Sequence, residues 1–130
     1  MSTIDTDLKY TKNHEWLRLE DDIGATCGIS DYAQEMLASL VVVELPDVGA
    51  DVKQGEAIAA VESAKAMFDI LSPVTGVIIA VNRELEDDPE LINSDPYGEG
   101  WIFKIDVKRM GELDDLLDAE EYQSFIDDGD

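Results

Sequence analysis

Lys65 is the residue whose type and setting point most directly to chemistry. It lies in a short polar interruption between two apolar segments, and its neighbours Ala64 and Ala66 are too small to shield its amine. A lysine that carries an acyl group needs such a setting, because a modifying enzyme must reach the amine and acylation then makes the side chain a long, neutral tether. An ordinary solvated lysine fits the same spacing. The pattern therefore nominates Lys65 and leaves both interpretations open.

The usual catalytic constellations are missing from the sequence. His14 is the only histidine, so imidazoles cannot build a zinc site, and a catalytic triad would have to use that one residue. The sequence has no G-x-S-x-G element, phosphate loop or dinucleotide fingerprint. Acidic pairs such as Asp87 and Asp88 are expected on the solvated faces of a chain with 31 acidic residues. We therefore expect a protein that is not an enzyme and has no metal site.

The charge of the chain restricts its partners. The 31 acidic and 9 basic residues give a formal net charge of −22. Such a surface repels phosphate backbones and anionic lipid, so we expect no binding to nucleic acid or to membranes. It suits partners with basic docking faces, which electrostatic attraction would steer toward the protein. Solubility, including adaptation to a salty cytoplasm, explains the same acidity.

The length and composition predict one domain spanning residues 1–130, with a core from about 8 to 126 and flexible ends. The 45% hydrophobic content is sufficient for a packed interior. Cys27 is the only cysteine, so it cannot form an intramolecular disulfide, and we interpret it as a core residue. The N-terminus resembles no secretory signal, and no apolar stretch approaches the roughly 20 residues of a membrane span. These features predict a soluble, cytoplasmic protein.

The hydrophobic pattern of the first half predicts strands with one short helix. Alternation indicates a strand over 16–20, with Leu17 and Leu19 on one face, then a turn over 21–24 and a second strand. That second strand would place Ala25, Cys27 and Ile29 together. Ser30 and Asp31 offer an N-cap for a helix through Leu37, with Asp31 and Gln34 as a weak capping box, and Leu40–Val43 is typical of a buried strand.

The second half repeats the strand pattern and ends in a helix. Two strands should run over Ala57–Val61 and along Val77, Ile79 and Val81, and residues 84–90 suggest a loop or ragged helix. Turn formers fill residues 95–100, and the last strand should present Trp101, Phe103 and Ile105. Leu113, Leu116 and Leu117 have helical spacing, and residues 118–121 form an acidic capping box for a helix through Ile126. These elements indicate a mainly β, barrel-like domain with peripheral helices.

Segments along nearly the whole chain resemble the glycine cleavage system H proteins. Val61–Ala66 is similar to their lipoyl-attachment motif, and the other similar segments follow in the family's order from about Leu8 to Phe125. One such segment would be weak evidence, but the ordered set is specific. The other segments are His14–Trp16, Gly28–Gln34, Val43–Pro46, Ser72–Gly76, Leu91–Trp101 and Ala119–Tyr122.

The resemblance implies a barrel-sandwich hybrid fold with a lipoyl group on Lys65 at a hairpin turn. It also implies that Glu62, Ser63, Ala64 and Ala66 mark the hairpin for recognition by lipoyl-attaching enzymes. The implied role is a carrier that takes an aminomethyl group from a pyridoxal-phosphate glycine decarboxylase to a tetrahydrofolate-dependent aminomethyltransferase. A dihydrolipoyl dehydrogenase then reoxidises the lipoyl group. Tethering, rather than a catalytic group, is the contribution of such a carrier.

The same resemblance implies a surface cleft that shelters the loaded arm. By motif match, Glu15 and Asp69 are expected to hold the cationic amine, with Asn13 beside them, where serine is common in the family. A carboxylate near an ammonium in a partly dry cleft forms a charge-assisted hydrogen bond. The sequence departs from the family at Met67 and Phe68, where small residues are usual, and a bulky Phe68 would either narrow the cleft or pack inward. We interpret His14 as structural or exposed, without a ligand role.

Other carriers are distinguishable from this pattern, and two alternative functions stay open. Biotin carriers have methionine on both sides of the lysine, whereas Lys65 lies between alanines. Lipoyl domains of 2-oxoacid dehydrogenases lack the His-Glu-Trp start that residues 14–16 form here. An H-like paralogue that serves in lipoyl relay or redox chemistry would fit the motifs. So would an unmodified acidic interaction domain that kept the hairpin and lost its cargo.

Overall fold

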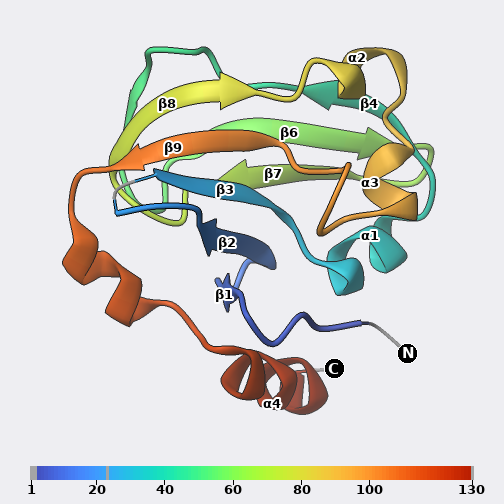
Figure 1. Cartoon of the computed structure of the whole chain (residues 1–130). Coiled ribbons are helices and arrows are strands. Elements are labelled where there is room, and N and C mark those ends of the chain that lie inside the picture. The colour runs from blue at the N-terminus through green and yellow to red at the C-terminus, as the bar shows by residue number, and fades with distance from the viewer. Residues whose placement is uncertain (1–2, 23, 130) are drawn as a thin grey trace.

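The computed structural model describes residues 3–22 and 24–129 and shows two antiparallel sheets packed around one core (Figure 1). Within these residues, one sheet has six strands in the order β1-β2-β3-β9-β8-β5, and the other has three in the order β4-β6-β7. The six-stranded sheet contains β1 (Lys9–Tyr10), β2 (Glu15–Leu19), β3 (Gly24–Ile29), β9 (Phe103–Val107), β8 (Gly76–Val81) and β5 (Asp51–Val52). The three-stranded sheet contains β4 (Leu40–Glu44), β6 (Ala57–Ser63) and β7 (Met67–Leu71). The predicted mainly β, barrel-sandwich architecture is confirmed.

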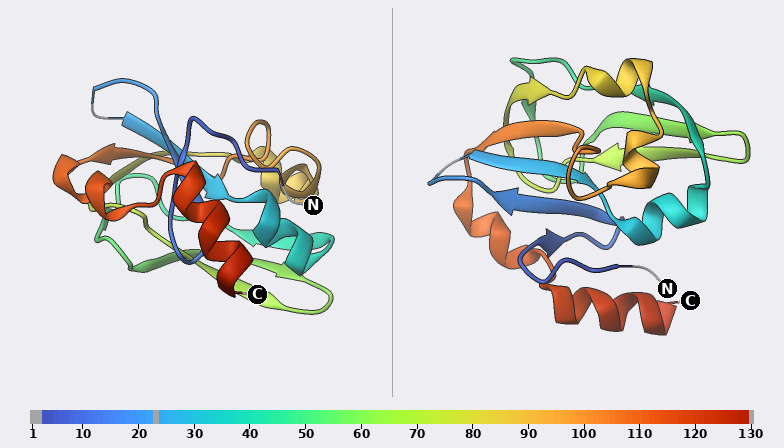
Figure 2. Two further views of the ribbon diagram at one scale, coloured as in Figure 1. Left: turned by 90° about the horizontal axis from the view of Figure 1, so that it is seen from below. Right: turned by 45° about the vertical axis from the view of Figure 1, so that its right-hand side comes forward.

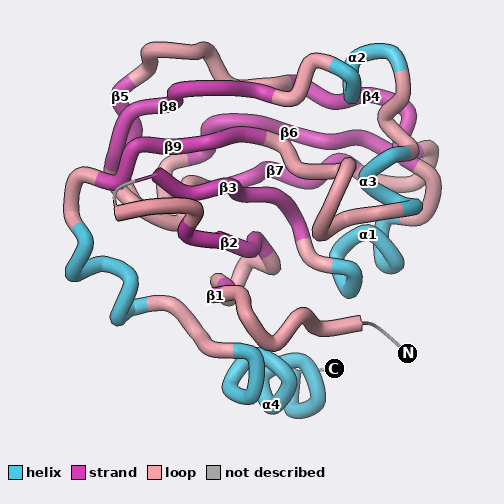
Figure 3. Tube along the Cα trace, in the orientation of Figure 1, coloured by secondary structure: helices cyan, strands magenta, loops and turns pink. Residues whose placement is uncertain are grey.

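The helices are short and lie at the periphery of the sheets (Figure 3). None of them, within the part of the chain that the structure describes, has the length and apolar character needed to cross a membrane. Their bounds are α1 (Asp31–Leu37), α2 (Glu84–Asp87), α3 (Leu91–Ser94), the 3-10 helix η1 (Met110–Asp115) and α4 (Ala119–Gly129).

The main core fills the space between the two sheets. Strand β3 supplies the three residues predicted for it, Ala25, Cys27 and Ile29, and all three are buried. Cys27 pairs with Phe103 across the β3–β9 ladder, so an early strand and the last strand of the chain meet in the middle of the six-stranded sheet. Burial raises the pKa of the Cys27 thiol well above its ordinary value, which keeps it protonated and apolar in character. Its role as a core residue is confirmed.

Strand β4 is an edge strand, and the prediction that it is buried was wrong. Leu40 is buried, but Val41 and Val42 are 56% and 45% exposed. The strand pairs on one side only, with β6, and an irregularity in register between Leu40 and Val42 turns Val41 outward. A run of β-branched residues shows that a segment is extended, but it does not show whether both of its faces are covered.

Two other strands differ from the predicted pattern in the face they present. In β8, the hydrophobic pattern suggested Val77, Ile79 and Val81 as the core-facing residues. Instead, Ile78 is buried and Ile79 is 50% exposed. In β2, Leu17 is buried while Leu19 is 45% exposed at the strand end, and Trp16 on the opposite face is also buried. Trp16 is covered because its strand is packed on both sides, which hydrophobic alternation alone does not predict.

Helix α1 has the predicted Ser30 cap and ends in a strained residue. The predicted Asp31–Gln34 capping box does not form, because the Gln34 amide donates to the Ser30 carbonyl and the Asp31 amide to the Tyr97 hydroxyl. The Ser30 hydroxyl accepts a hydrogen bond from the Ala33 amide and caps the N-terminus. At the C-terminus, Ala38 has φ 64° and ψ −157°, a backbone conformation that glycine adopts readily and other residues rarely do. Its amide donates to the Gln34 carbonyl, and its carbonyl accepts from the Asn93 side chain at 2.8 Å. A contact from helix α3, which is distant in the sequence, therefore helps to hold this residue in place.

The C-terminal segment confirms the terminal helix and corrects the region before it. Asp118 and Glu121 exchange hydrogen bonds between backbone amides and side chains, as a capping box does. The spacing of Leu113, Leu116 and Leu117 had suggested a helix, but η1 ends at Asp115 and Leu116 is extended. The Leu117 amide and carbonyl pair instead with Tyr10, which joins the tail to β1.

Helix α4 covers a second, aromatic cluster on the outer side of β1 and β2 (Figure 2). Tyr122 of the helix stacks on Tyr10 with ring centroids 4.3 Å apart and planes inclined by 2°. Such a pair contributes about 0.5–1.5 kcal/mol beyond its buried area. The buried members of this cluster are Leu8, Tyr10, Trp16, Tyr122 and Ile126.

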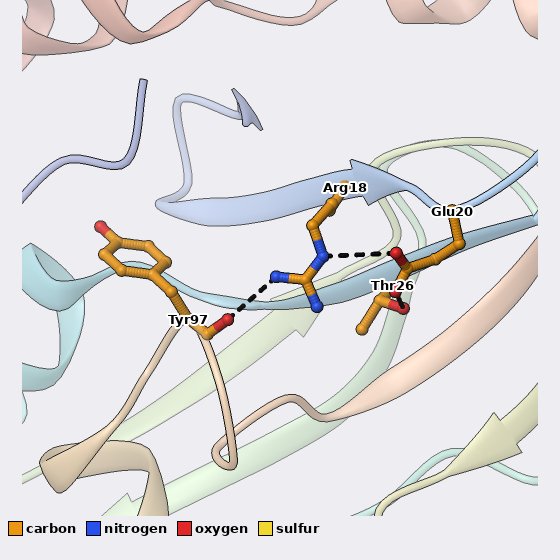
Figure 4. A network of polar contacts seen from close by, with 4 residues as sticks. All are labelled: Arg18, Glu20, Thr26 and Tyr97. Atoms are coloured by element: carbon orange, nitrogen blue, oxygen red, sulfur yellow. Dashed lines mark hydrogen bonds and ion pairs between the residues drawn. The ribbon is translucent and has the colours of Figure 1, made fainter. Parts of the chain in front are cut away.

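A polar network anchors the loop before β9 to the β2–β3 hairpin (Figure 4). The Arg18 guanidinium donates to the Tyr97 carbonyl at 3.0 Å, lies 3.5 Å from the Glu20 carboxylate, and sits over the Trp16 ring at 5.2 Å. The Thr26 hydroxyl donates to Glu20, and this hydrogen bond lowers the pKa of the Glu20 carboxyl. The network joins segments 79 residues apart in the sequence.

Candidate functional site

Lys65 lies at the tip of the β6–β7 hairpin, and local hydrogen bonds lock this tip. The Ser63 amide donates to the Ala66 carbonyl at 2.8 Å. The Ser63 hydroxyl accepts hydrogen bonds from the amides of Lys65 at 3.3 Å and Ala66 at 3.2 Å. Ser63 is buried, whereas Ala64, Lys65 and Ala66 are exposed. The serine therefore shapes the turn, and the lysine projects from it.

The Lys65 amine is accessible from solvent. In the part of the chain that the structure describes, none of the ion pairs includes Lys65. Its alanine neighbours offer no group that would cover it. The arrangement combines a rigid backbone with a freely reachable nucleophile, which is what covalent attachment of a tether requires.

The four residues predicted to mark the hairpin take different positions. Ala64 and Ala66 are exposed beside the lysine, and Glu62 is partly buried and pairs with Met67 across the hairpin. The Ser63 hydroxyl is occupied by the turn. Its contribution to recognition would therefore come through the shape of the tip rather than through a direct contact.

Among the described residues, Glu15 is the only charged residue that is buried, with 1% of its surface exposed. Its carboxylate accepts hydrogen bonds from the Thr11 hydroxyl, from the Asn13 side-chain amide at 2.6 Å and from the Leu71 backbone amide at 2.9 Å. Burial raises the pKa of the Glu15 carboxyl, and the three hydrogen bonds oppose that rise. The carboxylate therefore joins the β1–β2 turn to the far end of β7.

The structure brings Asn13, Glu15 and Asp69 together, as the sequence predicts, but Asp69 takes part through its backbone. The Asn13 amide donates to the Asp69 carbonyl at 3.2 Å. The Asp69 carboxylate is exposed on the outer face of the hairpin. The bulky Phe68 next to it packs against the core rather than filling the site. Of the two outcomes considered for Phe68, inward packing is confirmed.

A groove opens beside Glu15 on the side away from the hairpin tip. Its volume is about 280 Å³. Its lining combines the apolar residues Leu71, Pro73 and Leu116 with polar ones such as Gln54. We call this space the Glu15 groove; its lining residues are Thr11, Lys12, Asn13, Glu15, Gln54, Gly55, Leu71, Ser72, Pro73, Asp115 and Leu116.

The β1–β2 turn that carries Asn13 and Glu15 is held by helix α4. His14 has φ 72°, and its Nδ1 lies 2.8 Å from the Tyr122 hydroxyl, which also bonds the Ser30 hydroxyl at 2.7 Å. The His14 ring also packs against Tyr32 and Phe125. The expectation of a structural His14 is confirmed. Sequence reasoning missed the positioning role of Tyr122, because nothing in the sequence connects residues 108 positions apart.

Three comparisons place this geometry among known proteins. The family model described as "Glycine cleavage H-protein" matches residues 8–129. The glycine cleavage system H protein of Shewanella loihica is 55% identical over 127 residues and covers 98% of both chains. That of Psychrobacter sp. is 53% identical over 124 residues, which cover 95% of this chain and 98% of the relative. A crystal structure of the H protein from Mycobacterium marinum has a TM-score of 0.84 and 39% identity, over 93% of this chain and 97% of that one.

Proposed function

The chain belongs to the glycine cleavage H-protein family, a carrier component that shuttles groups on a lipoyl arm within the glycine cleavage system, and we propose that Lys65 bears this arm. The observation that carries the proposal is the hairpin tip. Its exposed amine lies between two alanines, on a turn that Ser63 keeps rigid. A lipoate carboxyl group forms an amide with a lysine amine, and nothing at this tip obstructs that reaction.

The protein in this role is a carrier and not an enzyme. A bound lipoyl group would supply a disulfide that accepts the aminomethyl group, and the dithiol left when that group is passed on would be reoxidised to the disulfide. The partners that we propose are glycine decarboxylase, the aminomethyltransferase, dihydrolipoyl dehydrogenase and a lipoyl-attaching enzyme, all in the cytoplasm. The contribution of the chain is a high effective concentration of the tethered group at each active site. Its acidic surface would attract partners with basic faces.

The distances along β7 support a sheltering role for Asn13 and Glu15. Asp69 lies four residues from Lys65 in the sequence, which is at most about 13 Å of strand. A lysine stem extended by a lipoyl chain has roughly ten bonds and, at about 1.2 Å each, spans about 12 Å. A folded-back arm would thus bring its end to Asn13 and to the Asp69 carboxylate, at the near end of the Glu15 groove.

Glu15 has the acceptor capacity to hold a cationic cargo at that position. Its Oε2 atom accepts from Asn13 and Leu71, whereas its Oε1 atom accepts only from Thr11 among the described donors. A carboxylate oxygen accepts two hydrogen bonds, so Oε1 retains one free acceptor position. An ammonium group there would form a charge-assisted hydrogen bond, with the Asp69 carboxylate adding attraction from outside.

Intact mass of the protein from cells supplied with lipoate, followed by peptide mapping, tests the attachment. We expect a gain of one lipoyl group on the peptide that contains Lys65. Lys65→Arg keeps the charge and blocks acylation, and it should abolish both the mass gain and glycine-dependent turnover without changing the fold. Lys53→Arg is the matched control, because Lys53 is also an exposed lysine at a turn. Modification that persists in Lys65→Arg would refute the assignment.

A further inference from the structure

The outer face of the three-stranded sheet exposes apolar residues directly behind the lysine. Val42 is 45% exposed and Met67 is 62% exposed. Both lie in one row across the sheet, because Val42 pairs with Glu62 and Glu62 pairs with Met67. We call these three residues the Val42–Glu62–Met67 row. Val41, 56% exposed at the irregularity in β4, lies next to it on the free edge.

The row borders a small hollow suited to one side chain. The hollow has a volume of about 40 Å³, and Ala60 is among the residues that line it. Ala60 lies on the same outward side and is only 8% exposed, so the hollow is recessed into the face. An apolar hollow next to exposed valine and methionine is a surface that a partner's apolar side chain would fill.

The charged residues of the three strands that form this face are all acidic. The three strands contain Glu44, Glu62 and Asp69 and no lysine or arginine. Asp69 pairs with Ala60 and is exposed, so its carboxylate lies on the same outward face. A partner that docks on this face must therefore combine an apolar centre with a basic rim.

The short reach of an unmodified lysine side chain indicates which partner would contact this face. An extended lysine stem spans about 6 Å, at about 1.2 Å per bond. An enzyme that acylates Lys65 must therefore bring its active site within that distance of the tip. Met67 is two residues from Lys65, about 7 Å along the strand, so the same enzyme must also lie over the row. Enzymes that act on the end of the completed arm meet it further from the tip and have no such constraint.

We propose that the Val42–Glu62–Met67 row, with Val41 and the Ala60 hollow, is the docking surface of the enzyme that attaches lipoate to Lys65, which meets it with an apolar side chain ringed by basic residues. The inference rests on the proposed attachment at Lys65. It extends recognition from the hairpin tip to an adjoining sheet face. Such a small contact fits the transient interaction of a modifying enzyme with its substrate.

Lipoylation kinetics of the full-length protein, with purified lipoate ligase, lipoate and ATP, test the proposal. The variant Val42→Thr/Met67→Ser keeps β-branching at residue 42 and removes the apolar contact. We expect its KM to rise about five- to tenfold with kcat within about twofold of wild type. The matched control is Ile79→Thr/Met110→Ser, which changes one exposed β-branched residue and one exposed methionine on other elements and should leave KM unchanged. Thermal unfolding of both variants confirms that they fold.

The salt dependence of KM tests the basic rim proposed for the partner. Raising the salt concentration from about 0.1 M to about 1 M shortens the screening length from about 10 Å to about 3 Å and should raise the wild-type KM. A wild-type KM in the double variant, or a loss confined to kcat, would overturn the docking proposal while leaving attachment at Lys65 intact. A wild-type protein that the ligase does not modify would instead refute the proposed function. Once lipoylated, the double variant should support glycine turnover at the wild-type rate.

Discussion

The hairpin tip and the Glu15 site lie at the two ends of β7 but are built in different ways. At the tip, every hydrogen bond that positions Lys65 joins residues two or three apart in the sequence. At Glu15, the bond to Leu71 joins residues 56 apart, and the turn that carries it is held by Tyr122 from the end of the chain. The tip is therefore a local structure, whereas the Glu15 site exists only in the folded molecule. Perturbing each one should have separable effects.

The largest expected effect is the loss of stability on removing the Glu15 carboxylate. Glu15→Ala would leave the partly buried Leu71 amide without its acceptor, remove one of the two acceptors of the Asn13 side-chain amide, and open a cavity where the buried carboxylate was. We expect the free energy of unfolding to fall by about 2–4 kcal/mol, measured by urea denaturation. Lys65 in the folded fraction should still be lipoylated at a rate near wild type. A large loss of lipoylation in folded protein would show that the two regions are coupled.

Relief of the backbone strain at Ala38 should raise the stability of the protein, in contrast to the loss expected for Glu15→Ala. Ala38→Gly replaces a residue at φ 64° by one that adopts this conformation without strain. We expect the free energy of unfolding to rise by about 1 kcal/mol after the entropy cost of glycine is subtracted. Ala57→Gly, at an exposed strand position, is the control and should destabilise. A loss of stability in Ala38→Gly would mean that the entropy cost of glycine outweighs the backbone strain, because the hydrogen bond from Asn93 to the backbone carbonyl is kept in both proteins.

A smaller effect is expected at the tip itself. Ser63→Ala removes the hydroxyl that accepts the amides of Lys65 and Ala66, at a cost of about 1 kcal/mol or less, because both amides then reach water. Hydrogen exchange at those two amides should become faster, while exchange at Leu71 stays unchanged. Protection lost at both ends of β7 would contradict the local character of the tip.

The smallest effect is the pH dependence that Glu15 adds to stability. Its pKa is raised above 4.5 in the folded state, so protonation favours the folded protein. The stability that the protonated form contributes is fully present below 4.5 and is lost as pH rises through the raised pKa. Wild type should therefore gain stability relative to Glu15→Gln as the pH is lowered from about 7 toward about 4.5. A difference between the two that stays constant over this range would show that Glu15 titrates at its ordinary pKa.

Much of the fold was predictable because its signals are local. The Ser30 cap, the Asp118–Glu121 capping box and the β3 core positions depend on spacings of two or three residues, and the structure confirms them. The predicted burial of β4 failed for a different reason. Val41 and Val42 have the composition of an interior strand, but a strand is exposed when nothing pairs with its edge or covers its outer face. Those properties belong to the sheet and not to the segment.

By itself, the sequence determined the hairpin tip and nominated Lys65, because a turn, two alanines and a serine two residues before the lysine all act within a few residues. Only the tertiary structure decided what surrounds that tip. It showed that Glu15 is a buried link to β7, that Asp69 bonds through its carbonyl, and that Val42 and Met67 share an exposed row. The physical reason is the range of the interactions: turn and cap hydrogen bonds are specified by neighbours in the chain, whereas burial and cross-strand contacts depend on segments that meet only when the chain folds.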